Sequence, residues 1–108
     1  MKIIEYRYTI PLDKRDEFLE YAKSTLKPTW QKHGCKKYEL SVVSSSVYVG
    51  RQIVEEGAFI ERLYFEDDFD LKNFYNDALT YDKEKTRAYE ARFLASSIEL
   101  RVLNVTVE

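Results

Sequence analysis

The chain has 108 residues, of which 44% are hydrophobic and 33% are charged, a composition typical of one soluble globular domain spanning residues 1–108. Its net charge of −2, with basic residues scattered among acidic ones, argues against nucleic-acid binding, and no apolar run approaches the roughly 20 residues of a membrane span. The single cysteine excludes an internal disulfide, and the N-terminus lacks the pattern of a secretory signal, so we expect a cytoplasmic protein.

The hydrophobic residues change their period along the chain in an order that predicts the fold. Four segments alternate with period two and two segments carry a helical period, in the order β-α-β-β-α-β. The predicted strands are Lys2–Ile10, Lys36–Val43, Ala58–Phe65 and Ile98–Val107, and the predicted helices are Asp13–His33 and Asp68–Ala95. This order is the split βαβ of an α+β, ferredoxin-like domain, with a four-stranded antiparallel sheet and helices on one face.

The first helical segment has clear boundary signals. Pro11 ends the preceding strand, Asp13 is placed to cap the helix, and Gly34 is a natural residue at the helix end. Pro28 should kink the helix near its C-terminus. The residues that recur every four positions, and that should therefore face the sheet, are Phe18, Ala22, Leu26 and Trp30.

Two later stretches are less regular. Ser44–Gly57 carries turn residues on either side of short apolar runs, and we predict an extended hairpin there. The second helical segment also carries an apolar face, and Thr80–Asp82 should interrupt it. The residues of that face are Leu71, Phe74, Tyr75 and Ala78.

Both faces of the predicted sheet carry large apolar side chains, although two helices can shield only one face. The opposed pairs are Ile3 with Ile4, Leu63 with Tyr64, and Val102 with Leu103. A large bare apolar face is unusual on a monomer, so we predict a homodimer joined through its sheet faces. The charged strand residues either form a polar network in that contact or are solvated at the open strand ends. These residues are Glu5, Arg7, Glu61, Arg62, Glu99 and Arg101.

Three stretches resemble dimeric α/β-barrel proteins, most closely the group of antibiotic-biosynthesis monooxygenases and NIPSNAP-like proteins. Trp30–Leu40 resembles the junction of the first helix and second strand in that group, where a Gly, a small residue and a Tyr-Glu-Leu-like strand are common. Glu61–Asp67 resembles the third strand and its exit, and Leu26–Trp30 is similar to the end of helix one in the NIPSNAP-like branch. The resemblance implies ferredoxin-like protomers that form a dimeric α/β barrel.

Two positions depart from the catalytic members of that group. Phe65 stands where the monooxygenases often carry a tryptophan, and Phe74 matches the histidine iron ligand of haem-degrading relatives. Neither departure supports the corresponding oxygenase chemistry. The resemblance therefore implies the fold and the dimer more directly than it implies an activity.

Aromatic residues are abundant, and several are placed to line a pocket between helices and sheet. Such a pocket would bind a small apolar or aromatic molecule through ring stacking and hydroxyl hydrogen bonds, and ordinary core and dimer packing is the alternative. Arg7, Arg62 and Arg101 would bind a ligand carboxylate, or else pair with Glu5, Glu61 and Glu99 across strands. The aromatic candidates are Tyr6, Tyr8, Trp30, Tyr38, Tyr64, Phe65, Phe74 and Tyr75.

Residues that carry catalysis in many enzymes are sparse. His33, the only histidine, suits a helix C-terminus, and Cys35 suits a buried strand entry. Glu39, Glu61 and Asp67 can act as general bases, but the sequence distinguishes none of them. We therefore expect no metal and no cofactor, with small-molecule binding as the function. A cofactor-independent monooxygenase acting on an aromatic or polyketide-like substrate and a purely structural homodimer are the two alternatives.

Overall fold

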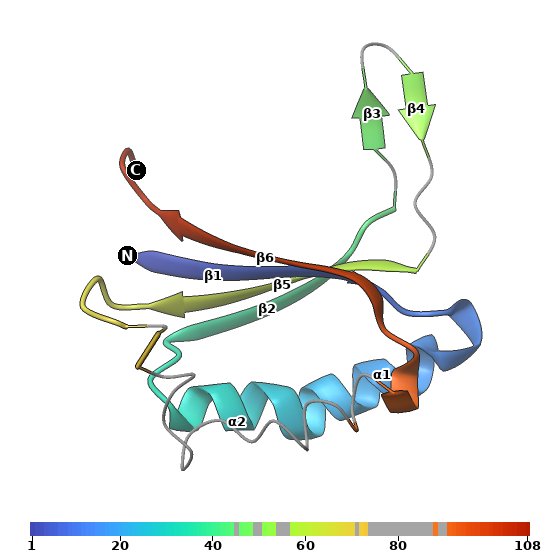
Figure 1. Cartoon of the computed structure of the whole chain (residues 1–108), viewed down its shortest axis with the longest axis horizontal. Coiled ribbons are helices and arrows are strands. Elements are labelled where there is room, and N and C mark those ends of the chain that lie inside the picture. The colour runs from blue at the N-terminus through green and yellow to red at the C-terminus, as the bar shows by residue number, and fades with distance from the viewer. Residues whose placement is uncertain (45, 49–50, 54–56, 71, 74–87, 89–90) are drawn as a thin grey trace.

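Four antiparallel strands form the main sheet in the order β2-β5-β1-β6 (Figure 1). The computed structural model describes the chain except for residues 45, 49–50, 54–56, 71, 74–87 and 89–90. The strands of the main sheet are β1 (Lys2–Thr9), β2 (Lys37–Val42), β5 (Ala58–Phe65) and β6 (Ser96–Asn104). The alternation of apolar and polar residues along these segments lets one face of the sheet pack against helices. The predicted four-stranded antiparallel sheet is confirmed.

β1 lies inside the sheet, because it pairs with β5 on one side and with β6 on the other. Its pairing with β6 is irregular between Arg7 and Thr9, and this shift lets β6 begin at Ser96, before the predicted strand. At its other end β6 stops at Asn104, opposite Lys2, and so ends earlier than predicted. The start of β1 thus sets the end of β6.

A helical layer follows β1 and covers one face of the sheet (Figure 1). The layer consists of a 3-10 turn (Leu12–Lys14), helix α1 (Arg15–Tyr21), a π-helical stretch (Ala22–Leu26) and helix α2 (Lys27–Lys32). The predicted sheet-facing stripe is confirmed, because Phe18 and Ala22 are buried while Leu26 and Trp30 pack against the core. We call the face of the sheet that this layer leaves uncovered the outer face.

Proline and glycine set the irregularities of this layer. Pro28 has no N–H and its ring crowds the carbonyl of Ser24, so a regular α-helical bond cannot form there and the chain is π-helical through this turn. Gly34 ends the layer with a φ of +95°, as predicted. The predicted cap by Asp13 is wrong, because the 3-10 turn begins directly after Pro11 and contains Asp13, and no side-chain cap bond forms at that turn.

Two apolar clusters lie between the helical layer and the sheet. The first cluster consists of Tyr8, Ile10, Phe18, Phe59 and Phe93, and the second consists of Ile4, Cys35, Leu63 and Phe65. The ring centroid of Phe18 lies 5.1 Å from that of Phe59 and 5.5 Å from that of Phe93, both in edge-to-face geometry. In the second cluster, Phe65 stacks on Phe69 with centroids 3.7 Å apart.

The predicted second helix, Asp68–Ala95, falls mostly outside the described residues, as does its predicted interruption at Thr80–Asp82. Residues 72–73, 88 and 91–93 are helical, and Phe93 joins the first cluster. Within the described part of the chain, no helix combines the length and the apolar character that crossing a membrane requires.

A separate two-stranded sheet lies between β2 and β5 in the chain. β3 (Ser46–Tyr48) and β4 (Arg51–Ile53) pair antiparallel, in agreement with the hairpin predicted for Ser44–Gly57. Figure 1 shows this hairpin standing clear of the main sheet, on the side away from the helical layer. The hairpin therefore projects on the same side of the molecule as the outer face.

Candidate functional site

Glu61 is a carboxylate in the middle of the sheet that points toward the helical layer. Along β5 it lies between Phe59 and Leu63, which face the same way, and it is only 5% exposed. Its cross-strand neighbours are Tyr6 on β1 and Leu40 on β2. An ionisable group is thus surrounded on the sheet by aromatic and apolar residues.

A tyrosine hydroxyl stabilises the ionised form of this carboxylate. The Tyr38 hydroxyl on β2 donates a hydrogen bond to Oε2 of Glu61 at 2.5 Å. Burial raises the pKa of Glu61 to about 7, against the hydrogen bond from Tyr38, which lowers it. Near neutral pH the group is therefore divided between its protonated and ionised forms, which is the condition for accepting and returning a proton.

Glu61 also lies between the two apolar clusters of the core. Phe59, two places before it on β5, belongs to the first cluster, and Leu63, two places after it, belongs to the second. On the helical layer, Leu26 packs against the first cluster and Trp30 against the second. Tyr6 contacts both clusters, and its ring centroid lies 6.3 Å from that of Trp30. The carboxylate thus lies among aromatic rings between the helical layer and the sheet.

A second buried carboxylate, Glu5, lies on the outer face. It is 2% exposed, with Nε of Arg62 2.9 Å from one carboxylate oxygen and Nε of Arg101 3.0 Å from the other. Burial raises the pKa of Glu5, but hydrogen bonds and charge from Arg101 and Arg62 outweigh burial and hold that pKa below its ordinary value. Glu5 therefore stays ionised at neutral pH and has a structural role.

A tyrosine–glutamate pair on the outer face provides a comparison with Glu61. The Tyr64 hydroxyl donates to Oε1 of Glu39 at 2.5 Å, and the Lys37 ammonium lies 5.2 Å from the centroid of the Tyr64 ring. The hydrogen bond from Tyr64 holds the pKa of Glu39 below its ordinary value. The Glu39 side chain is 39% exposed, so it escapes the burial that raises the pKa of Glu61.

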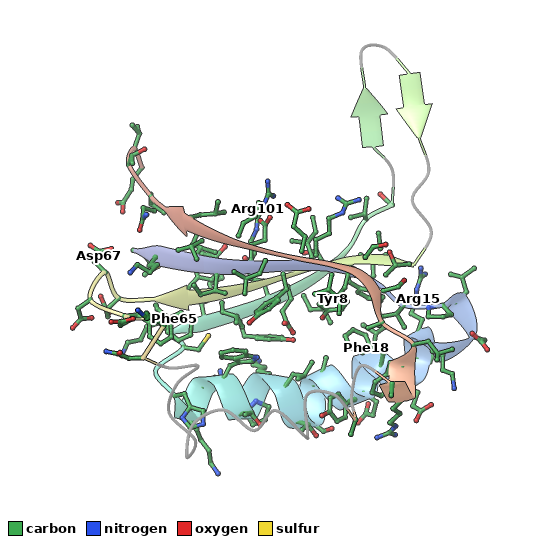
Figure 2. All side chains as sticks on the ribbon, viewed as in Figure 1. Tyr8, Arg15, Phe18, Phe65, Asp67 and Arg101 are labelled. Carbon is green, nitrogen blue, oxygen red and sulfur yellow. The ribbon has the colours of Figure 1, made fainter. Side chains whose placement is uncertain are left out.

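The structure divides the predicted site residues between the two faces of the sheet. On the helix-facing side lie Tyr6, Tyr8, Trp30, Tyr38 and Phe65. On the outer face lie Arg7, Arg62 and Tyr64, because neighbouring residues on a strand point to opposite faces. Figure 2 shows this division, with Tyr8 and Phe65 toward the helical layer and Arg101 on the opposite side. Phe74 and Tyr75 lie outside the described residues.

The charge network predicted from the sequence does not include Glu61 in the structure, so that part of the prediction is wrong. Side chains along β5 point alternately to the two faces of the sheet, so Glu61 faces the helical layer while the charged residues of the network lie on the outer face. Arg62 points to the outer face and pairs with Glu5, which confirms the cross-strand pairing that the sequence left open as an alternative to ligand binding. The sequence did contain a signal for Glu61, since it is the one acidic residue in an alternating set that is otherwise apolar. That set is Phe59, Glu61, Leu63 and Phe65.

Cys35 and His33 have structural positions. The buried Cys35 thiol donates to the carbonyl of Lys37 at 3.0 Å, and burial raises the pKa of this thiol, which opposes formation of a thiolate. His33 is the C-cap residue of α2, as expected for a histidine at a helix end. Among the described residues, no three His, Cys, Asp or Glu side chains gather closely enough to hold a metal ion.

Solved structures share this architecture along nearly their whole length. A protein from Deinococcus radiodurans, provisionally described as an antibiotic biosynthesis monooxygenase, superposes with a TM-score of 0.64 and 9% identity over 100% of this chain and 95% of that chain. An ethyl tert-butyl ether D (EthD) family protein from Bacillus halodurans gives a TM-score of 0.62 and 14% identity over 98% of this chain and 100% of that chain.

A third structure, from an uncultured marine organism and described as a dimeric ferredoxin-like protein, gives a TM-score of 0.53 and 10% identity over 99% of this chain and 97% of that chain. The fold is ferredoxin-like. The resemblance to the antibiotic-biosynthesis monooxygenase group is thereby confirmed at the level of the fold, and the similarity of Leu26–Trp30 to the NIPSNAP-like branch stays a prediction. No protein-family model matches the sequence, and no curated protein matches it significantly.

Proposed function

We propose that this ferredoxin-like protein binds a small, largely apolar aromatic molecule between its helical layer and its sheet. The observation that carries the proposal is the buried carboxylate of Glu61, held by the Tyr38 hydroxyl in a surrounding of aromatic rings. Burying a carboxylate is unfavourable unless it is paired, and among the described residues the partner of Glu61 is a tyrosine hydroxyl rather than a cation. Buried ionisable groups with a displaced pKa concentrate at functional sites.

The chemistry of these groups defines the ligand. Tyr6 and Trp30 offer ring surfaces, and Glu61 offers an oxygen that accepts a hydrogen bond when ionised. An aromatic molecule that carries a hydroxyl group matches both features, because its ring stacks while its hydroxyl donates to the carboxylate. We therefore expect a neutral hydroxylated aromatic compound.

Fluorescence of Trp30, the only tryptophan, provides the test, with 2-naphthol as the probe. We expect saturable quenching, and we expect Glu61→Gln to weaken binding about tenfold or more, since a hydrogen bond to a charged group contributes about 1.5–3 kcal/mol. Glu39→Gln is the matched control, because Glu39 also accepts a tyrosine hydroxyl at 2.5 Å but lies on the outer face. Equal affinity in Glu61→Gln, or no binding by the wild type, would contradict the proposal.

We further propose that the protein is a homodimer joined through its outer face. The apolar residues Ile3, Ile60, Tyr64 and Leu103 lie on that face beside a line of charges, and the β3–β4 hairpin projects on the same side (Figure 1). A second copy is the simplest cover for such a face. Sedimentation equilibrium at micromolar concentration should give the dimer mass, and a monomer mass would overturn the proposal.

A further inference from the structure

The outer face carries a row of four charges, one on each strand of the main sheet. Cross-strand pairing places Glu39 of β2 opposite Arg62 of β5, Arg62 opposite Glu5 of β1, and Glu5 opposite Arg101 of β6. The row therefore crosses the whole sheet at a right angle to the strands. Its signs alternate, as minus, plus, minus, plus.

Contacts within the protomer hold this row in place. Arg62 and Arg101 both bind Glu5, which is 2% exposed, while their own side chains remain 44% and 56% exposed. The Tyr64 hydroxyl fixes Glu39, whose side chain is 39% exposed. The guanidinium groups and the outermost carboxylate thus keep free surface, and their positions are set before any partner arrives.

A second copy can pack on the outer face with its charge row aligned to the first in two orientations. The alternating signs of the charges distinguish these two orientations. If the two-fold axis runs along the row, every charge faces the same residue of the other copy, so like charges meet. If the axis runs along the strands, the row is reversed in the second copy. Glu39 then faces Arg101 of the other copy, and Arg62 faces Glu5 of the other copy. Opposite charges are therefore aligned at every position, and Glu39 and Arg101 have the exposed surface to make direct contact.

We propose that a second copy docks on the outer face with the two-fold axis along the strands, between β5 and β1, so that the two charge rows interdigitate with opposite signs. This inference rests on the homodimer proposed above and adds its orientation and the residues that select it. Packed sheets lie about 10 Å apart, a distance that one arginine and one glutamate side chain span together. Strands of the two copies then run nearly parallel, as in aligned sheet packing.

One of the two neighbouring rows on the same face agrees with this orientation. Cross-strand pairing orders it as Lys37, Tyr64, Ile3 and Leu103 from β2 to β6. Reversal places Tyr64 against Ile3 of the other copy, at the centre of the contact next to the axis. The large apolar groups therefore meet each other, while Lys37 lies at the edge, where its ammonium reaches water.

Charge reversal at the two ends of the row tests the orientation. Glu39→Lys or Arg101→Glu alone replaces two attractive contacts per dimer by two repulsive ones, and we expect the dimer Kd to rise about tenfold. The double variant restores opposite charges between copies and should return Kd to near the wild-type value. Glu17→Lys, a charge reversal on helix α1 away from this face, is the control and should leave Kd unchanged.

Effects within one protomer cannot produce this rescue. Positions 39 and 101 lie on the two edge strands, three strand spacings or about 14 Å apart, so their intrachain disturbances add in the double variant. A double variant weaker than either single variant, or single variants as tight as the wild type, would overturn the orientation and leave the dimer standing. A monomeric wild type would overturn the dimer itself.

The salt dependence of the wild-type dimer Kd tests the same orientation without any substitution. This test applies even if a charge-reversed variant fails to fold. Opposite charges across the contact predict that Kd rises as NaCl is raised from about 0.05 to 0.5 M, because salt screens their attraction. Like charges across the contact predict that Kd falls. A falling Kd would therefore exclude the reversed arrangement.

Discussion

The Tyr38 hydroxyl donates to Glu61 at 2.5 Å on the helix-facing side, and the Tyr64 hydroxyl donates to Glu39 at 2.5 Å on the outer face. Both pairs join β2 to β5, yet the two carboxylates have opposite shifts. Burial raises the pKa of Glu61 to about 7, whereas the hydrogen bond lowers the pKa of the more exposed Glu39. A tyrosine–glutamate pair thus titrates near neutral pH on the helix-facing side, whereas on the outer face the same kind of pair keeps a permanent negative charge.

The stability of the protein should fall as pH rises from about 5 to 7.5. Glu61 has a pKa of about 7 in the folded chain and an ordinary value of 4.5 when unfolded, so the folded state binds more protons between these values. The free energy of unfolding should therefore decline by about 2 kcal/mol across this window and level off above it. Urea denaturation at a series of pH values measures the decline.

Glu61→Gln is the control for this profile, since it removes the titrating group and should flatten the curve between pH 5 and 7.5. Among the described residues, the other carboxyl groups with a displaced pKa are Glu5, Glu39 and Asp67, and because their pKa values are lowered they do not act in this window. Burial raises the pKa of Glu5, but its hydrogen bonds to Arg101 and Arg62 dominate, and the Tyr64 hydrogen bond lowers that of Glu39, so both affect stability only in more acidic solution. A flat wild-type profile would show that Glu61 titrates normally.

Tyr38→Phe should move the midpoint of the Glu61 titration above 7. The Tyr38 hydroxyl lowers this pKa, so its removal leaves burial less opposed. Carbon-detected NMR of the glutamate carboxyl groups measures the midpoint directly. Tyr64→Phe is the matched substitution and should instead raise the pKa of Glu39 while leaving Glu61 unchanged. A lower Glu61 midpoint in Tyr38→Phe is incompatible with the observed hydrogen bond.

Much of the fold follows from local rules that operate within a few residues. The period-two alternation located Ala58–Phe65 with the bounds that the structure has, because each position on that strand has a consistent inside or outside. The four-residue spacing from Phe18 to Trp30 predicted the sheet-facing stripe of the helical layer for the same reason. Gly34 ended that layer as its positive φ requires.

The candidate site was harder to predict because it depends on which face of the sheet becomes covered. Tyr38, Tyr64 and Glu61 all lie on strands, and only the pairing of β2 with β5 decides which tyrosine meets which carboxylate. A local pattern does not contain that register. The burial of Glu5 likewise depends on Arg62 and Arg101, which are 57 and 96 residues away in the chain.

Glu5→Gln should destabilise the protein by about 1–3 kcal/mol at neutral pH. The buried carboxylate holds two guanidinium groups, and the substitution removes its charge from both contacts at once. Glu17→Gln is the matched control, because Glu17 also binds an arginine, Arg92, at 2.6 Å but is 50% exposed. An exposed pair contributes about 0–1 kcal/mol, so the control should be nearly silent in urea denaturation. Equal losses would show that burial of Glu5 has no energetic consequence.

Replacing Gly57 by alanine should be far more damaging than replacing Gly34. Both residues have positive φ, +77° and +95°, so each substitution carries a backbone cost of about 1–2 kcal/mol. A Cβ at Gly34 meets nothing within 4 Å, whereas a Cβ at Gly57 would clash with the carbonyl oxygen of Ile10. That contact is with backbone and cannot be relieved by a side-chain rotation.

The clash in Gly57→Ala also disturbs the end of the main sheet, because the amide of Ile10 donates a hydrogen bond to the carbonyl of Gly57 at 2.7 Å. Moving the two backbones apart breaks this bond where β1 meets β5, and overpacking adds about 1–3 kcal/mol to the cost. Urea denaturation compares the two alanine variants, and hydrogen exchange at the Ile10 amide reports the local opening. Faster exchange at Ile10 in Gly57→Ala but not in Gly34→Ala is expected, and equal exchange in both would contradict the close approach.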